Sequence, residues 1–227
     1  MQINADFEVR VALDTNQMPW VASPTLQVQR KMLDRLGGEV ARATSIVRYE
    51  SGSSFPSHMH GGGEEILVLE GVFEDEHGVY PTGTYLRHPP GTSHHPGSSA
   101  GCTLFVKLWQ FTPGDTQSVC TDTNIQTWYP GLVSGLEVMP LHEADGVNTA
   151  LVRWAPHTQF NRHVHPGGEE ILVLEGVFYD EFGAYPAGSW LRSPCYSAHT
   201  PLTKNEGALI YVKTGHIGAP SLPLPKG

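Results

Sequence analysis

Residues 58–73 read HMHGGGEEILVLEGVF, and residues 163–178 read HVHPGGEEILVLEGVF. The second stretch repeats the first at an offset of 105 residues, and the last twelve residues of the two are identical. When the comparison runs on to Pro96 and Pro201, 25 of 39 positions are identical at the same offset. So much identity at one fixed offset indicates an internal duplication, and we therefore read the chain as two related units.

Each copy carries a His-x-His pair, then a glutamate and later a third histidine. Side chains two apart on a β-strand point to the same face, so His58 and His60 project together. Glu64 and His94 follow, and the second copy repeats the whole set as His163, His165, Glu169 and His199. An isolated His-x-His pair would be read as solvated or packed histidines. Three imidazoles with a carboxylate instead form a ligand set for Zn, Fe, Mn, Ni or Cu. The sequence therefore predicts one metal site in each unit.

This pattern resembles the cupin superfamily. The first motif of that family, Gly-x5-His-x-His-x3-Glu-x6-Gly, is matched from Gly52 to Gly71, and the second, Gly-x5-Pro-x-Gly-x2-His, from Gly83 to His94. The second copy departs at two glycine positions, which hold His157 and Tyr196. We expect these departures to affect turns rather than ligands. The resemblance implies two tandem antiparallel β-barrels of jelly-roll type, a bicupin, with the ligands inside each barrel near one open mouth.

The family spacing also selects one of two adjacent glutamates in each copy. Glu64 and Glu169 fit the motif, whereas Glu65 and Glu170 fall one residue late. On a pleated strand that extra residue faces the opposite side. We therefore predict that Glu64 and Glu169 bind the ion.

The 227-residue chain suits two all-β units, because short apolar runs alternate with turns rich in its 25 glycines and 18 prolines. We predict a first cupin domain over residues 1–114 and a second over 115–227, with residues 112–123 as the linker. Residues 7–13 alternate in polarity, which predicts an edge strand covering the other unit. The tail 219–225 holds too many prolines for a helix or a central strand.

The formal net charge of -9 and the absence of a basic run argue against nucleic-acid or anionic-membrane partners. The sequence shows neither a signal peptide nor an apolar stretch of transmembrane length, and three cysteines make no disulfide framework. We therefore expect a cytoplasmic protein. Cys195, four residues before His199, is read as a small buried hydrophobe, with a redox role as the alternative.

Further runs resemble the cupin domain of the ChrR anti-sigma factors: Trp20, residues 43–49, residues 62–76 and the Tyr-Pro-x-Gly motif that begins at Tyr80. Members of that group govern a transcriptional response to singlet oxygen and related oxidants. Their cupin domain carries a metal, typically zinc, through His, His, Glu and His. The resemblance thus implies one divalent transition metal per domain, with zinc leading and iron, nickel or manganese as alternatives.

A full ChrR protein also has an N-terminal helical domain that binds the sigma factor and holds zinc with His and Cys. In this sequence the first histidine is His58 and the first cysteine is Cys102. We therefore expect a duplicated sensor half that does not bind a sigma factor. A homodimer, formed through the β-sheets, is expected by analogy with other cupins.

Three function classes remain open on the sequence alone. The leading one is a metal-binding, ChrR-like bicupin that senses small oxidised molecules. The second is a metal-dependent dioxygenase, whose ion would bind the enolate of a small diketone- or flavonol-like substrate. The third is a structural or storage role. Four protein ligands suit both a closed and an open ion, so the residue types do not decide. Two repeated arginine pairs either orient an anionic substrate or form structural salt links: Arg48 with Arg153, and Arg87 with Arg192.

Overall fold

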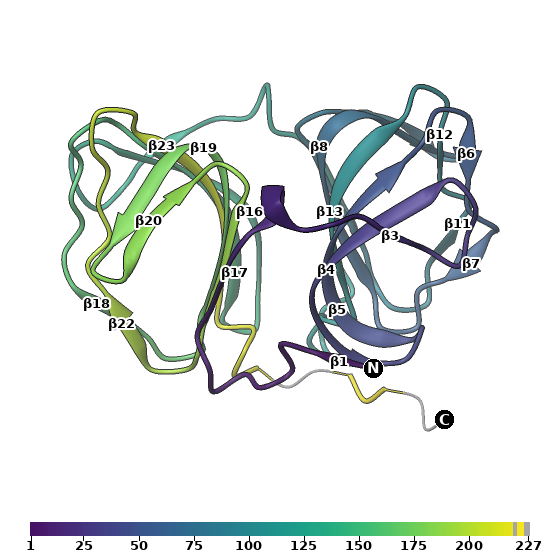
Figure 1. The fold of residues 1–227 in the computed structure, drawn as a ribbon, viewed down its shortest axis with the longest axis horizontal. Coiled ribbons are helices and arrows are strands. Elements are labelled where there is room, and N and C mark those ends of the chain that lie inside the picture. The colour runs from purple at the N-terminus through teal and green to yellow at the C-terminus, as the bar shows by residue number, and fades with distance from the viewer. Residues whose placement is uncertain (220–221, 225–227) are drawn as a thin grey trace. The chain divides into compact units, whose positions relative to one another are not determined.

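A computed structural model of the chain describes residues 1–219 and 222–224, and it confirms an almost entirely β architecture (Figure 1). The helical element in this described part is the 3-10 turn η1 (Thr15–Gln17). The described chain forms two compact units. The first holds residues 1–5, 19–126 and 222–224, and the second holds residues 6–18 and 127–219. The proline-rich tail predicted over 219–225 falls partly outside the described residues.

The first unit is a barrel of antiparallel strands, drawn in purple to teal in Figure 1. Its main sheet has the order β1-β4-β5-β13-β8-β10-β14, and β7 pairs separately with β11. Its core gathers inward-facing apolar residues of these strands, including Ile66, Val68, Phe73 and Leu104. The strands are β1 (Gln2–Ile3), β3 (Val21–Ala22), β4 (Val28–Gly37), β5 (Ala41–Tyr49), β6 (Ser53–Ser54), β7 (His58–Met59), β8 (Glu64–Asp75), β9 (Gly78–Pro81), β10 (Thr84–His88), β11 (Ser93–His94), β12 (Gly97–Ser98), β13 (Cys102–Leu108) and β14 (Val119–Asp122).

The second unit repeats this arrangement. Its main sheet has the order β15-β16-β17-β23-β19-β21-β2, and β18 pairs with β22. Its core includes Leu136, Trp154, Ile171 and Phe178. The strands are β2 (Val11–Asp14), β15 (Tyr129–Pro130), β16 (Leu136–Ala144), β17 (Val147–Trp154), β18 (His163–His165), β19 (Glu169–Asp180), β20 (Gly183–Pro186), β21 (Ser189–Ser193), β22 (Ser197–His199) and β23 (Ala208–Thr214).

The repeat extends to an irregularity in strand register. Where β13 pairs with β8, the partner shifts between Val68 and Glu70 and so skips Leu69. Where β23 pairs with β19, the partner shifts between Val173 and Glu175, 105 residues later. A bulge bends its strand and increases the local twist, and it is kept where that shape matters. The duplication in sequence is therefore also a duplication of the detailed sheet geometry.

Two strands in corresponding places close the barrels. β2 pairs with β21 of the second unit, from Val11 against Arg192. This confirms the predicted edge strand, although the strand begins at Val11 rather than at Phe7. β14 pairs with β10 of the first unit, from Val119 against Arg87. Residues 112–123, which we predicted as the linker, include this four-residue strand, Val119–Asp122.

The compact units therefore differ from the predicted domains 1–114 and 115–227 in two short segments. Residues 6–18 belong to the second unit, and residues 115–126 belong to the first.

The two departures from the cupin glycine pattern lie in turns, as expected. Gly52 and Gly91 have φ of 76° and 89°, and their counterparts His157 and Tyr196 have φ of 58° and 60°. All four residues therefore adopt the left-handed conformation that favours glycine. The second unit keeps the same turns at the cost of side chains in a strained backbone region.

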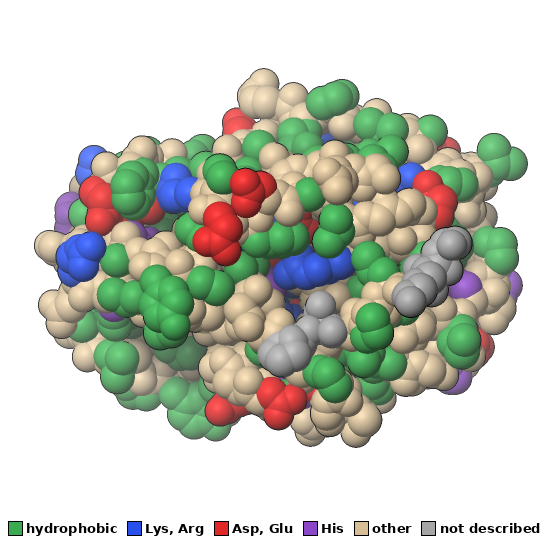
Figure 2. All heavy atoms as spheres, turned by 90° about the horizontal axis from the view of Figure 1, so that it is seen from below, with side chains coloured by type: hydrophobic (Ala, Val, Ile, Leu, Met, Phe, Trp, Pro, Cys, Tyr) green, Lys and Arg blue, Asp and Glu red, His purple; other side chains and the backbone are tan. Residues whose placement is uncertain are grey.

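The surface and the cysteines bear on the excluded partner classes. No helix in the described part of the chain has the length and apolar character needed to cross a membrane. On the face drawn in Figure 2, Lys and Arg side chains occur in small groups separated by acidic, apolar and neutral ones. The three cysteines are free: Cys102 is buried, Cys120 is exposed and Cys195 is partly buried.

Candidate metal centres

Strand pairing brings the predicted ligands together in each barrel. In the first, β7 pairs with β11 so that His58 lies directly opposite His94. Glu64 begins β8, which is a neighbour of both β10 and β13. In the second, β18 pairs with β22 so that His163 lies opposite His199. Period-two alternation places the remaining histidine of each His-x-His pair on the same face.

The ligand atoms of each predicted set lie within 4.8 Å of one another. The first cluster is His58, His60, Glu64 and His94, and the second is His163, His165, Glu169 and His199. Three residues of each cluster are buried, while His58 and His163 are partly exposed. The structure thus brings together all eight residues that the sequence singles out.

In each cluster, the distances from the glutamate to two of the histidines match those of a coordination shell. Oε2 of Glu64 lies 3.5 Å from Nε2 of His60 and 3.4 Å from Nε2 of His94. Oε2 of Glu169 lies 3.5 Å from Nε2 of both His165 and His199. A tetrahedron with metal–ligand bonds of about 2.1 Å has edges of about 3.4 Å. An ion therefore fits between the glutamate and these two histidines, and the remaining histidine of each cluster lies within 4.8 Å of the other ligand atoms.

The hydrogen-bonding state of the imidazoles also fits an ion. Among the described residues, the buried Nε2 atoms of His60, His94 and His165 have no hydrogen-bond partner. Buried polar atoms are rarely left unsatisfied, and an ion is one of the explanations for such atoms. The Nδ1 atoms of His58 and His163 each lie 2.9 Å from a backbone oxygen, of Pro56 and Asn161. With the proton held on Nδ1, the Nε2 lone pair is free to bind a metal.

In each cluster, one aspartate lies against the third histidine. Nδ1 of His94 lies 3.2 Å from Oδ2 of Asp75, and Nδ1 of His199 lies 3.6 Å from Oδ2 of Asp180. Such carboxylate–histidine contacts fix the ring orientation and raise the basicity of the ligating nitrogen. The ligand sets predicted from the sequence include neither aspartate. Their recurrence at the 105-residue offset was the available signal.

His88 distinguishes the first cluster from the second. It lies opposite Glu64 in the β8–β10 pairing, and its Nδ1 is 3.3 Å from Oε2 of that glutamate. Its ring stacks on His60 with centroids 5.6 Å apart. The residue opposite Glu169 is Ser193. Sequence comparison of the two copies could not flag His88, because the copies differ at this position.

The surroundings set the two glutamates to opposite states. Burial alone raises the pKa of Glu64, but the contact with His88 and the nearby His60 and His94 outweigh it and lower the pKa to about 2. For Glu169 burial dominates and raises the pKa to about 7, although His199 opposes it. Without an ion, therefore, the surroundings favour the carboxylate form of Glu64 at neutral pH and shift Glu169 toward its protonated form.

The pKa values of the cluster imidazoles shift in different directions. Burial lowers the pKa of His60 to about 4 and that of His165 to about 3. Burial also lowers the pKa of His94, whereas Asp180 and Glu169 together overcome burial and raise the pKa of His199. Neutral imidazole is the form that binds metals, so burial keeps His60 and His165 ready for an ion well below neutral pH.

The neighbouring glutamates face away from the clusters, as predicted. Glu65 accepts a hydrogen bond of 3.0 Å from Arg87, which also pairs with Asp115. Glu170 accepts a hydrogen bond of 2.9 Å from Trp190, and its other oxygen lies 3.0 Å from Nε2 of His216. These are buried structural networks on the other face of the strand.

The repeated arginines make structural contacts with acidic, backbone and aromatic groups. Arg87 is held by Glu65 and Asp115, while Arg192 donates to the backbone oxygen of Asp6 at 2.8 Å. Arg48 and Arg153 stack over Trp20 and Trp128, in each case 4.0 Å from the ring centroid. Of the two readings left open by the sequence, these contacts favour the structural one.

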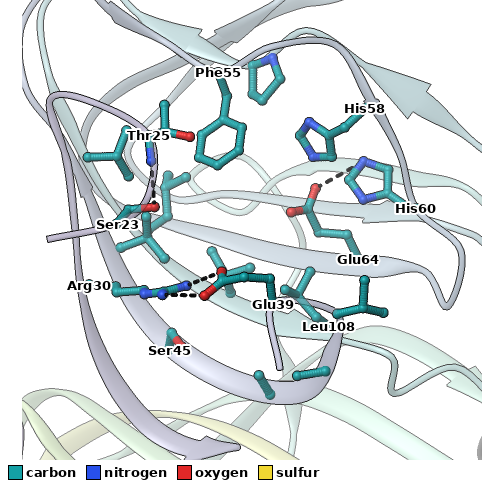
Figure 3. A pocket seen from close by; sticks show the side chains of 18 of the residues that line it. Ser23, Thr25, Arg30, Glu39, Ser45, Phe55, His58, His60, Glu64 and Leu108 are labelled. Atoms are coloured by element: carbon teal, nitrogen blue, oxygen red, sulfur yellow. Dashed lines mark hydrogen bonds and ion pairs between the residues drawn. The ribbon is translucent and has the colours of Figure 1, made fainter. Parts of the chain in front are cut away.

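A cavity of about 730 Å³ lies beside the first cluster. His58, His60 and Glu64 form one side of it, and Arg30 with Glu39 form another (Figure 3). Much of the wall between them is apolar, with Val47, Phe55, Leu104, Val106 and Leu108 among its members. A cavity of this size and character accommodates a drug-sized small molecule.

The model of the ChrR cupin-like domain matches this chain twice, over residues 8–112 and 116–218. The chain belongs to the ChrR cupin-like family. The two matched segments correspond to the two halves of the duplication, so each ChrR cupin-like half contributes one His, His, Glu, His cluster. No curated protein sequence matches the chain.

Solved structures with this fold include proteins of several descriptions. A proposed dioxygenase from Nostoc punctiforme has a TM-score of 0.76 and 14% identity, covering 97% of this chain and 88% of its own. A deletion mutant of Bacillus subtilis oxalate decarboxylase has a TM-score of 0.61 and 13% identity, covering 93% and 78%. A bacterial pirin from Escherichia coli, solved in complex with nickel(II), has a TM-score of 0.63 and 16% identity, covering 91% and 99%. At these identities the likeness shows the bicupin fold alone.

Proposed function

We propose that each half of the protein binds one divalent transition-metal ion and that the first half couples this ion to a small-molecule ligand, as a ChrR-like sensor of oxidised molecules. The observation that carries the proposal is the set of buried imidazole Nε2 atoms that lack a hydrogen-bond partner among the described residues and face a glutamate at 3.4–3.5 Å. Zinc is the leading ion, with iron, nickel or manganese as alternatives, because the His₃Glu set serves all of them.

The residues of the two clusters and their neighbours would have different roles in such a site. The His-x-His strands and the third histidines would hold the ion, and Asp75 and Asp180 would orient His94 and His199. His88 would keep Glu64 in its ionised, ligating form. The apolar wall beside the first cluster would limit water around the ion and thereby strengthen electrostatic interactions there. A bound ion would act as a Lewis acid toward an oxygen atom of a ligand in that cavity.

Elemental analysis of the untreated protein tests metal binding directly. We expect two ions per chain, one ion per chain in either His94→Ala or His199→Ala, and none in the double variant. His95→Ala is the matched control, because its exposed side chain is next to His94 in sequence but lies outside both clusters. Full metal content in the double variant would overturn the assignment of the sites.

A dioxygenase acting on a small diketone- or flavonol-like molecule is the second candidate. The cavity favours both sensing and catalysis over a purely structural ion, because a closed structural ion would have no need of about 730 Å³ of ligand space beside it. Oxygen uptake with acetylacetone or quercetin, measured on protein loaded in turn with iron, nickel and zinc, separates the two functions. Two tightly held zinc ions without oxygen uptake support sensing, whereas turnover with iron or nickel supports catalysis.

The expected partners belong to the same proposal. The formal net charge of -9 argues against nucleic acid and anionic membranes as partners, and we expect a cytoplasmic protein. We expect no sigma-factor binding by this chain, and a homodimer as its assembly. A pull-down with candidate sigma factors and light scattering of the metal-loaded protein test these two points. A captured sigma factor would restore the anti-sigma-factor interpretation.

A further inference from the structure

The far side of the first-half cavity carries a preformed carboxylate receptor. Arg30 faces Glu39 there in a two-point contact, with Nη1 to Oε2 and Nη2 to Oε1 both at 3.3 Å (Figure 3). The guanidinium fork therefore already presents two parallel donors to a carboxylate, which is the geometry that arginine uses to recognise such groups. Glu39 demonstrates from within the chain that a carboxylate fits this position.

The two partners of this contact differ in how firmly they are held. The Arg30 side chain is 17% exposed, whereas the Glu39 side chain is 66% exposed. Nε of Arg30 is buried and has no hydrogen-bond partner among the described residues. Exposed ion pairs contribute little stability, so Glu39 can leave at small cost while Arg30 remains in the wall. A second cation lies close by, since Arg35 also lines the cavity and donates 2.9 Å hydrogen bonds to the backbone oxygens of Gly38 and Glu39.

The second half lacks this receptor. Arg30 pairs with Val47 in the β4–β5 register, and Val138 pairs with Val152 in the β16–β17 register. Val47 and Val152 are equivalent at the 105-residue offset, so Val138 stands where the first half has Arg30. By the same register, Glu143 stands where the first half has Arg35. Both cations are thus particular to the half that contains the cavity described above.

We propose that the first-half cavity binds a small organic carboxylate with an apolar body, whose carboxylate replaces Glu39 on Arg30 and whose body lies along the apolar wall toward the metal cluster. This inference rests on the proposed function, since it names the ligand class of the same cavity. The charges of the cavity wall favour an anionic ligand. When Glu39 leaves, Arg30 and Arg35 remain as two cations in a largely apolar wall, and a bound anion neutralises their positive charge. The apolar body then gains from burial against Val47, Phe55 and Leu104.

Decanoate and decanol are the matched probes, because they share an apolar chain and differ in the anionic head. Isothermal titration of zinc-loaded protein is expected to show one decanoate site per chain and at least about tenfold weaker binding of decanol. Arg30→Val, which installs the residue of the second half, is expected to weaken decanoate at least about tenfold and leave decanol unchanged. Glu39→Gln, which removes the competing carboxylate, is expected to strengthen decanoate severalfold.

Arg162→Val is the control, because it removes one exposed positive charge in the second half without touching the cavity. Its decanoate affinity should match that of the parent protein. Equal binding of decanoate and decanol, unchanged decanoate affinity in Arg30→Val, or no decanoate binding at all would overturn the proposal. If Arg30→Val fails to fold, the Glu39→Gln and decanol comparisons still decide. Zinc content separates the two hypotheses: two zinc ions without decanoate binding would refute this inference and leave the metal sites intact.

Discussion

Replacement of Asp75 by asparagine tests how much the support of His94 contributes to metal affinity. Oδ1 of Asp75 accepts hydrogen bonds from the backbone of His77 and Gly78 and from the Tyr80 hydroxyl, while Oδ2 faces Nδ1 of His94 at 3.2 Å. Asparagine keeps an oxygen for the turn and places an NH₂ group against the ring N–H. The substitution therefore removes the contact with His94 and preserves the local fold.

Loss of such an outer contact weakens metal binding by about 10- to 100-fold, which corresponds to about 1.4–2.7 kcal/mol. Asp180→Asn should have a smaller effect, below about 10-fold, for two reasons. Its contact with His199 is longer, at 3.6 Å, and its charge is shared with Arg10, whose Nη2 lies 3.2 Å from Oδ2. The first half thus depends on its aspartate more than the second does.

Competition with a chromophoric zinc chelator measures each affinity, provided that the other cluster is disabled. Asp75→Asn is measured in the His199→Ala background, and Asp180→Asn in the His94→Ala background. A zinc affinity unchanged by Asp75→Asn would refute the idea that this aspartate tunes the ligand. Equal losses in the two halves would refute the role assigned to Arg10.

Three further predictions concern pH, His88 and backbone strain. Metal binding requires an ionised glutamate, and the pKa is about 7 for Glu169 but about 2 for Glu64, so binding of the second ion should weaken by about tenfold per pH unit below 7 while the first ion is retained. The metal content of each single-cluster variant after dialysis between pH 7.5 and 5 checks this, and loss of the first ion before the second would contradict it. His88→Ser should raise the pKa of Glu64 and shift release of the first ion toward neutral pH, while Ser193→His should shift release of the second ion to lower pH. The same dialysis measures both shifts, and variants that release metal like the parent would show that His88 does not act on Glu64. Tyr196→Gly should stabilise the fold by about 1 kcal/mol by relieving the strain of a left-handed φ of 60°, and Gly91→Ala should destabilise it by a similar amount. Urea unfolding measures both, and a less stable Tyr196→Gly variant would show that the tyrosine makes a contact that stabilises more than the strain costs.

The ligand sets could be predicted from the sequence because two independent signals agree. The duplication shows which residues recur, and the period of two in β-strands shows which of them share a face. The family spacing selected Glu64, the strand period placed Glu65 on the opposite face, and in the structure Glu65 accepts a hydrogen bond from Arg87. Where a residue recurs and its periodicity is simple, sequence reasoning reaches the correct side chain.

The outer contacts were missed for reasons of register. His88 meets Glu64 because β10 pairs with β8, and that pairing offset cannot be read from residue types. Asp75 recurs as Asp180, but a polar residue before a turn is commonly assigned to the turn. The recurrence was therefore not interpreted as a sign of a role at the metal centre. The strand β14 was hidden in the same way, since Pro-Gly and polar residues precede it.

The two halves share every predicted ligand and differ in what surrounds those ligands. Ser193 occupies the position equivalent to His88, and Val138 occupies the position equivalent to Arg30. The glutamates at the two centres have pKa values displaced in opposite directions. These differences alter proton competition at the metal and the charge of the cavity wall, while leaving the ligand geometry alone. Any measurement that averages over both ions therefore mixes two distinct sites, and a single affinity for the chain has no microscopic meaning. Variants that disable one cluster at a time are the condition for assigning chemistry to either half.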